Sequence, residues 1–175
     1  MLHGIDIQLV TKHLKPEWLH RAVEQGRKRV AVKAAYEPRT MKDILRHIKN
    51  QGSVGFVLDQ YAGPPVGVRV PVFGVPVSTS TALATLARRT GAVVVTATNY
   101  RLPDGRHALE IGPEIPWIED PDPTRELALN TAHYAKIVEA LIRAHPEQWL
   151  WTHQRFKGDL SPLRPNEWAE GRVRT

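Results

Sequence analysis

Apolar and polar residues follow two spacings along the chain, which predict strands and helices in alternation. Short apolar segments rich in β-branched residues predict strands at residues 5–11, 30–35, 54–58, 93–98 and 107–111. Apolar residues at intervals of three to four predict helices that begin near Pro16, Thr40, Thr79 and Asp122. This order favours the α/β class, with a mixed, mostly parallel sheet flanked by helices in a single domain over residues 1–157.

The segment around Asp59 is predicted to hold the functional site. Residues 54–58 form an unbroken apolar run, which we expect to be a strand buried on both faces. The run ends at Asp59 and Gln60, in a loop that Gly63 and Pro64 stiffen. Open α/β sheets bind ligands at the carboxyl ends of their strands, so these two polar side chains are candidates for a site.

Three further expectations concern local structure. Residues 78–81 should open a helix whose N–H groups face the same crevice, and residues 93–98 should be a second buried strand. The Pro-rich and acidic segment 112–123 should be a solvated loop. The predicted core faces of the first two helices include Trp18 and Met41.

Composition limits the function classes. The chain has 175 residues, 42% of them hydrophobic, which suffices for one substantial core. It has no apolar stretch of transmembrane length and no signal-peptide pattern, so by itself it resembles a cytosolic protein. The absence of Cys excludes thiol catalysis, and no two His have metal-binding helical spacing. A net charge of +6 favours an anionic partner: nucleic acid, lipid phosphate or an acidic carrier protein.

Four motifs carry a family resemblance. They are G-x-V-G-F-x-x-D-Q-x-x-G-P at residues 52–64, V-x-V-P-x-F-G-x-P-x-x-T at 68–79, L-A-x-R-T-G-A at 86–92 and H-P-E-Q-W-L-W-x-H-x-R-F-K at 145–157. In this order they resemble the lipid A biosynthesis acyltransferases, the lauroyl/myristoyl enzymes within the lysophospholipid acyltransferase superfamily. The resemblance implies that the fold is the C-terminal portion of an acyltransferase-type fold.

The catalytic motif of that family has no counterpart in this sequence. The motif is a histidine followed, five positions on, by an aspartate or glutamate. Five positions after the eight histidines stand Gln8, Trp18, Gln25, Gly52, Gly112, Val138, Leu150 and Gly158. The chain therefore resembles the later part of such an enzyme, and we assign no catalytic residue to it. We expect the chain to be inactive alone.

The resemblance also implies a reaction. In the complete enzyme a histidine would deprotonate a hydroxyl of a phosphorylated glycolipid or lysophospholipid, which then attacks the thioester of an acyl carrier protein or acyl-CoA. No metal or other cofactor is expected. The implied setting is the membrane surface at the cytoplasmic face of the bacterial inner membrane, with the anchor outside these residues, and nucleic acid is disfavoured as a partner.

Site residues carry over from the family position by position. Asp59 and Gln60 correspond to an acidic block that positions the acceptor or the catalytic loop, which Gly63 and Pro64 shape. Lys12 corresponds to a basic residue at a strand end that faces the lipid. Two plainer interpretations stay open, because Lys12 could be a solvated strand end and Asp59 could cap its own loop. A lone arginine in a loop, Arg69, is a weaker candidate.

The segment 149–157 combines aromatic and basic residues at intervals of two. If the segment is extended, Trp149, Trp151, His153, Arg155 and Lys157 share one face. Such a face could lie at a lipid interface, could stack single-stranded nucleic acid, or could pack its Trp rings on the preceding long helix. The resemblance favours contact of Arg155 and Lys157 with phosphate, supported by His153.

Two alternative functions stay open beside the acyltransferase. One is a non-catalytic module that binds anionic lipid or nucleic acid. The other is a hydrolase that uses Ser78 or Ser80 with a distant His and Asp59, although no G-x-S-x-G motif supports it. Residues 158–175 are expected to be an extended, poorly ordered tail. If part of the sheet is missing, we expect an uncovered edge and self-association.

Overall fold

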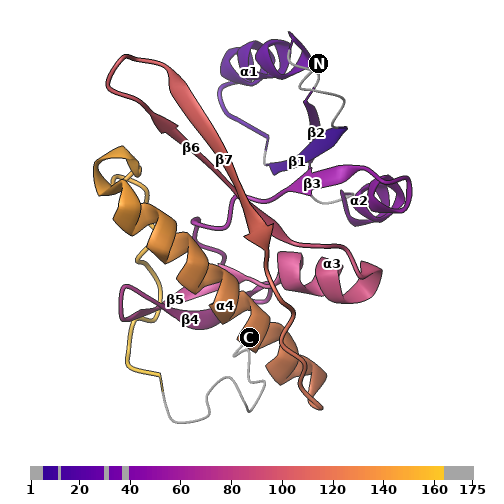
Figure 1. Ribbon diagram of the computed structural model, residues 1–175, viewed down its shortest axis with the longest axis vertical. Helices are drawn as coiled ribbons and strands as arrows, with labels where there is room; N and C mark the ends of the chain where they lie inside the picture. Colours follow the sequence, from indigo (N-terminus) through magenta and orange to yellow (C-terminus); the bar gives the residue numbers. More distant parts are fainter. Residues whose placement is uncertain (1–5, 12, 30–31, 37–39, 164–175) are drawn as a thin grey trace. The chain divides into compact units, whose positions relative to one another are not determined.

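The computed structural model describes residues 6–11, 13–29, 32–36 and 40–163 of the chain (Figure 1). Within it the chain divides into an N-terminal unit, Met1–Val57, and a C-terminal unit, Leu58–Thr175. The α/β class is confirmed. The parallel and antiparallel strand pairs, which were expected in one mixed sheet, form three separate sheets among the described residues. The single domain over residues 1–157 stays a prediction.

The N-terminal unit is built on a three-stranded parallel sheet in the order β2-β1-β3. Its elements are β1 (Ile7–Thr11), α1 (Glu17–Arg29), β2 (Lys33–Tyr36), α2 (Thr40–Lys49) and β3 (Ser53–Gly55). Each helix connects two parallel strands, as the sequence predicts. Because the two crossovers run in opposite directions from strand to strand, the right-handed rule places α1 and α2 on opposite faces of the sheet.

The helices of this unit bury less apolar surface than predicted. Ile44 on α2 is 2% exposed, as expected for a core position. Met41 is 38% exposed and Trp18 on α1 is 69% exposed, so the prediction that both lie in the core is wrong. On α1 the polar side chain of Arg27 binds the strands instead, by donating to Tyr36 on β2 and to Thr11 on β1.

The predicted strand at residues 54–58 is shorter and less buried than expected. β3 ends at Gly55 because it pairs with β1 on one side only, over three residues. Val57 lies beyond the strand and is 50% exposed. An apolar run shows how much surface a segment could bury, whereas the length of a strand depends on its partner.

The C-terminal unit contains two antiparallel hairpins, and its long helix packs against the first of them. Its elements are β4 (Gly67–Val72), β5 (Val75–Ser80), α3 (Ala82–Thr90), β6 (Val95–Arg101), β7 (His107–Glu114), α4 (Pro123–Ala144) and the 3₁₀ turn η1 (Pro146–Gln148). The long helix α4 lies along β4 and β5 (Figure 1). Val70, Val72 and Val77 of this hairpin form the core with Ala135 of α4.

Residues 78–80 belong to a strand and not to a helix start. They close β5, where Ser80 pairs with Gly67 and Thr79 is fully buried. The helix α3 begins only at Ala82, and Thr81 makes no side-chain capping bond there. Ser and Thr are compatible with both structures, and here the pairing with β4 decides. The helix ends at Gly91, which adopts a left-handed conformation with φ 66°.

The expected buried strand at residues 93–98 is largely exposed. β6 begins at Val95 and pairs only with β7 among the strands of the described residues. Val93 is 63% exposed and Val95 47%. The predicted strand at residues 107–111 is confirmed as part of β7, which pairs with β6 in the antiparallel direction. The prediction of burial fails because the apolar run occurs in a two-stranded hairpin, which leaves one face of the pair open.

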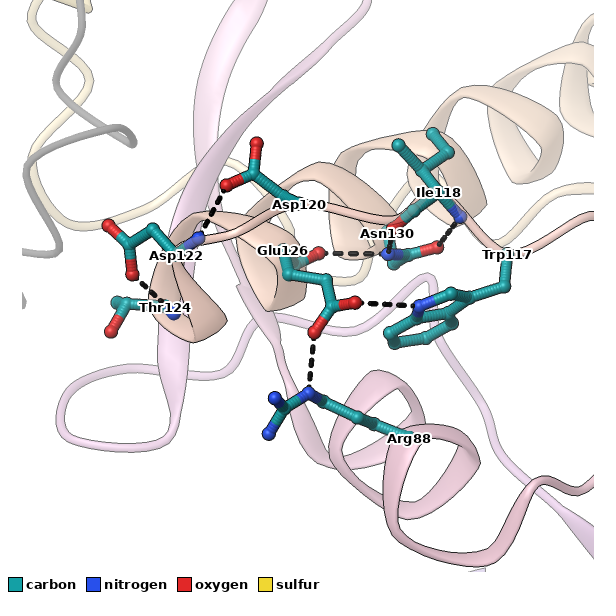
Figure 2. Close-up of polar contacts among 8 residues, drawn as sticks. All are labelled: Arg88, Trp117, Ile118, Asp120, Asp122, Thr124, Glu126 and Asn130. Carbon is teal, nitrogen blue, oxygen red and sulfur yellow. Dashed lines mark hydrogen bonds and ion pairs between the residues drawn. The ribbon is translucent and has the colours of Figure 1, made fainter.

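The segment before α4 is largely exposed, as predicted, but it is also hydrogen-bonded to that helix (Figure 2). Asn130 accepts a hydrogen bond from the backbone N–H of Ile118 at 3.0 Å and donates one to its carbonyl oxygen at 2.8 Å. Asp122 caps the helix as predicted by accepting from the N–H of Thr124 at 2.8 Å. The side-chain amide of Asn130 thus satisfies the backbone N–H and C=O of Ile118, as a neighbouring strand would.

Glu126 connects three parts of the C-terminal unit (Figure 2). Its carboxylate accepts hydrogen bonds from Nε1 of Trp117 at 3.0 Å and from Nε of Arg88 on α3 at 2.5 Å. The indole N–H, followed by the guanidinium, holds the pKa of Glu126 below its ordinary value of 4.5. The fold therefore stabilises the ionised carboxylate.

This arrangement predicts a pH-dependent effect of Glu126→Gln. Because the folded pKa is below the unfolded one, the contribution to stability is present above about pH 4.5 and is lost as the pH falls through the folded value. We expect the variant to be less stable near neutral pH, with a difference that shrinks in acid. Urea unfolding followed by Trp fluorescence over a pH series measures this. Glu119→Gln, at an exposed position, is the control, and a difference that stays constant with pH would contradict the assignment.

Candidate functional site

A buried arginine organises the region that the sequence singles out. Arg155 is only 2% exposed. Its Nη1 donates to the carbonyl oxygens of Gln60 at 2.5 Å and Ser78 at 3.0 Å, and its Nη2 donates to Oγ1 of Thr79 at 2.7 Å. Burial lowers the pKa of Arg155 to about 10, and the charge of Asp59 acts in the opposite direction. The guanidinium therefore ties the loop after Asp59 to strand β5.

Asp59 is held by the same C-terminal segment. Its Oδ2 accepts a hydrogen bond from Nε1 of Trp149 at 2.8 Å. A half-buried carboxylate needs such a partner, because an unpaired charge away from water is costly. Residues 59–60 and the segment 145–157 are thus joined at two points across about ninety residues of sequence. We call Asp59, Gln60, Trp149 and Arg155 the Asp59 cluster.

The segment 149–157 is folded back on itself, so the expectation of one extended face is wrong. The N–H of Trp151 donates to the carbonyl of Trp149 at 2.9 Å, and that of Arg155 to the carbonyl of His153 at 2.7 Å. These local bonds turn the chain at each step. Arg155 consequently points inward, while Trp151 is 56% exposed. Direct contact of Arg155 with a phosphate stays a prediction, because its bonds here are to the protein.

Aromatic rings gather around Phe73 in the turn between β4 and β5. The ring centroids of Trp149 and Trp151 each lie 6.2 Å from that of Phe73, and Phe156 lies at 6.4 Å. Arg143 of α4 is 4.7 Å above the Phe73 ring. The Trp residues therefore pack beside the hairpin and near the long helix, which agrees with the packing interpretation of this segment.

The loop that follows Asp59 is fixed to β5. The N–H of Ala62 donates to the carbonyl of Ser78 at 3.2 Å, and the Ser78 hydroxyl donates back to the carbonyl of Ala62. At Gly67 any Cβ would overlap that same carbonyl oxygen, so the close approach requires glycine. Gly63 lies beside Tyr61, and Pro64 is exposed in the turn. That Gly63 and Pro64 shape a substrate loop stays a prediction.

The remaining candidates lie at different places. Lys157 is exposed, with its Nζ 4.7 Å above the ring of Tyr61. His153 is half-buried, and its Nδ1 has no hydrogen-bond partner among the described residues. Arg69 binds Asp159 at 3.3 Å and the backbone carbonyl of Ser161, so the described start of the predicted tail is tied to β4. Lys12 lies outside the described residues.

The described residues lack both a metal-binding cluster and a membrane-spanning helix. No group of three or more His, Asp or Glu side chains in this part of the chain could hold a metal ion. No helix there is both long enough and apolar enough to cross a membrane.

A family model described as bacterial lipid A biosynthesis acyltransferase matches residues 2–158. The chain belongs to this family. It is 33% identical over 129 residues to a lipid A biosynthesis lauroyltransferase of Escherichia coli K12, covering 71% of this chain and 40% of the relative. It is 34% identical over 143 residues to a lipid A biosynthesis palmitoleoyltransferase of the same organism and to a lipid A biosynthesis acyltransferase of Shigella flexneri, covering 81% of this chain and 44% of each relative.

The chain spans less than half the length of these lipid A acyltransferases. Within that span, the Asp59 cluster joins two of the motifs on which the resemblance rests. Sequence reasoning named Asp59, Gln60 and Arg155 but missed Thr79 as a partner of the guanidinium and Trp149 as the donor to Asp59. The sequence offered one sign of the second contact, a hydrogen-bond donor (the indole of Trp149) in one motif and an acceptor (the carboxylate of Asp59) in the other.

The buried guanidinium predicts a large effect of Arg155→Lys. Lysine retains the charge but cannot reach three acceptors in different directions, so carbonyl oxygens are left without donors. We expect a loss of about 3 kcal/mol in the free energy of unfolding. Urea unfolding measures it, with Arg89→Lys on the exposed side of α3 as the matched control. A loss no larger than that of the control would show that the bonds to Arg155 contribute little.

Proposed function

We propose that this chain supplies the acceptor-binding part of an acyltransferase. The reaction moves a fatty acyl chain from the thioester of an acyl carrier protein or acyl-CoA to a hydroxyl of a lipid A precursor or lysophospholipid. The observation that carries the proposal is the Asp59 cluster, because it joins two separate motifs of the lipid A acyltransferase family at 2.8 Å and 2.5 Å. The names of the relatives, lauroyltransferase and palmitoleoyltransferase, support the chemistry.

In this proposal Asp59 binds and orients the acceptor. Trp149 fixes one carboxylate oxygen and thereby the plane of the group. The second oxygen would accept a hydrogen bond from an acceptor hydroxyl or amide, a charge-assisted contact of the strong kind. Arg155 binds the carbonyl oxygen of Gln60, next to Asp59, and so sets the position of the loop, and we assign it a positioning role.

The general base of the reaction has no candidate in this sequence. Each of the eight histidines lacks an acid five positions on, and no thiol is present. Activation of the acceptor hydroxyl needs a base within hydrogen-bond reach. We therefore propose that the chain binds acceptor but by itself transfers no acyl group.

The proposed partners are anionic. A net charge of +6 suits a phosphorylated glycolipid, a phospholipid surface and an acidic carrier protein. Exposed Lys157, close to the Asp59 cluster in sequence, is the candidate for phosphate contact. We place the reaction at the cytoplasmic face of the bacterial inner membrane, with this chain as a peripheral portion.

A non-catalytic module that binds anionic lipid would share these features, and one experiment separates the two functions. The purified chain is mixed with radiolabelled acyl-thioester and phosphorylated glycolipid, and both transfer and equilibrium binding are measured. We expect binding without transfer. We also expect Asp59→Asn to weaken acceptor binding about tenfold, because Asn keeps an oxygen for Trp149 but loses the charge offered to the acceptor.

Asp104→Asn, in the exposed turn of the β6–β7 hairpin, is the matched control and should bind like the parent chain. Unchanged affinity of Asp59→Asn would remove Asp59 from the acceptor site. Acyl transfer by the parent chain would show that it does contain a general base. Equal binding of acceptor glycolipid and an oligonucleotide, both lost with salt, would favour a general anion-binding module over the acyltransferase.

A further inference from the structure

Three large apolar side chains in the tail motif are exposed. Leu150 is 65% exposed, Trp151 56% and Phe156 36%. The rings of Trp151 and Phe156 belong to one aromatic cluster, since their centroids lie 6.2 Å and 6.4 Å from that of Phe73. Leu150 directly precedes Trp151 and extends the exposed stretch. Single exposed apolar residues are normal, whereas several together mark an interaction surface. We call Phe73, Leu150, Trp151 and Phe156 the apolar patch.

The base of this patch is held by α4. Phe73 has a φ of 50°, in the left-handed region that bulky residues rarely adopt. Its N–H donates to Oε2 of Glu139 at 2.6 Å, which anchors the turn between β4 and β5 to the helix. Backbone strain of this kind persists where the surrounding structure enforces it, often beside a site that binds a ligand. The other rings of the patch therefore rest on a fixed support.

The indole of Trp151 offers mostly hydrocarbon to its surroundings. Its one polar side-chain atom, Nε1, donates to the carbonyl oxygen of Pro146 at 2.6 Å. The ring stands nearly perpendicular to that of Trp149, with the centroids 4.6 Å apart and the planes inclined by 77°. These two contacts fix the ring while more than half of the residue stays exposed. Removal of this surface from water would be favourable.

Cations flank the apolar patch. The guanidinium carbon of Arg143 lies 4.7 Å from the centroid of the Phe73 ring, and the exposed Lys157 ends the same motif. Arg143 pairs with Glu139 at 2.8 Å, but its side chain is 61% exposed and that of Glu139 only 19%, so the positive charge faces the solvent. Glu147 in η1 is an exposed acid nearby in the chain. Exposed Trp beside cations suits the boundary between hydrocarbon and anionic headgroups.

The apolar patch borders the Asp59 cluster. Trp149 binds Asp59 at 2.8 Å, and its ring centroid lies 4.6 Å from that of Trp151 and 6.5 Å from that of Phe156. A lipid acceptor whose polar group reaches Asp59 has its acyl chains in a bilayer. The surface beside that carboxylate would then lie at the level of the headgroups.

We propose that the apolar patch is the surface by which this chain lies on an anionic membrane. Trp151 and Leu150 enter the headgroup region, and Arg143 and Lys157 bind lipid phosphates. Side chains that enter only this region require no membrane-spanning helix. The proposal rests on the function proposed above in one respect, namely that the acceptor is a membrane lipid. Trp and Arg also dominate protein interfaces, but the position beside the proposed acceptor site favours a bilayer.

Binding of the full chain to vesicles tests this proposal. The probes are vesicles of phosphatidylcholine alone and of phosphatidylcholine with phosphatidylglycerol, both without glycolipid acceptor and acyl thioester. We expect the chain to sediment with the anionic vesicles, and less so as the salt concentration rises, because salt screens the headgroup charge. Lipids brominated near the headgroup should quench Trp fluorescence, and the quenched fraction should fall in Trp151→Phe, which keeps an apolar ring.

Matched variants assign the binding to the patch. Trp151→Ser and Leu150→Ser should each weaken binding to the anionic vesicles about tenfold, because each removes an inserted apolar side chain. Trp18→Ser on α1 and Leu109→Ser on β7 make the same changes at positions that are 69% and 59% exposed, and they should bind like the parent chain. Because Leu150 is itself 65% exposed, its variant should keep the fold, which circular dichroism verifies even if Trp151→Ser unfolds.

The contribution of charge is tested separately. Arg143→Gln should weaken binding to the anionic vesicles about fivefold and reduce its dependence on salt. Arg106→Gln, in the exposed turn of the β6–β7 hairpin, is the matched control and should do neither.

Three results would overturn the proposal. They are no binding of the parent chain to anionic vesicles, equal binding of Leu150→Ser and Leu109→Ser, and binding of an acidic carrier protein through the same residues while vesicles do not bind. Since the vesicles contain no acceptor, a failure here is distinguishable from a failure of acceptor binding at Asp59.

Discussion

The burial of one guanidinium, that of Arg155, constrains how the C-terminal unit folds. Arg155 is removed from water and keeps its charge only because carbonyl and hydroxyl oxygens surround it and Asp59 lies nearby. Those oxygens belong to the loop at Gln60 and to strand β5, so the loop, the strand and the segment 149–157 must come together for the charge to be solvated. The orientation of Trp149 toward Asp59 follows from the same closure.

The predictions that held depend on local chemistry. The order of strands and helices in the N-terminal unit and the start of α4 at Asp122 are encoded within a few residues. The predictions that failed concern residues 54–58, 78–81 and 93–98, where the outcome depends on which strand is available as a partner. An apolar or β-branched run carries no information about that partner.

In the candidate site, too, single residues could be predicted, whereas contacts between distant residues could not. The family resemblance pointed to Asp59, Gln60 and the tail motif, but no spacing rule could show that Trp149 binds Asp59 or that Arg155 faces inward. Those contacts join residues ninety or more positions apart. The alternation at residues 149–157 predicted one exposed face because it assumed an extended backbone, whereas the turns in that segment send alternate side chains to different environments.

Polar side chains have a structural role throughout this molecule. The largest fully buried side chains of the described residues include the polar ones of Asn130, Thr79 and Thr131 as well as Val70 and Val77. Since Thr79 is itself a partner of Arg155, the interior and the Asp59 cluster share one hydrogen-bond network. A substitution in that network changes stability and binding together. The substrate role of the site is therefore best examined at exposed Lys157, where a change of charge leaves the buried network in place, whereas a change at Asp59 needs a measurement of stability beside that of binding.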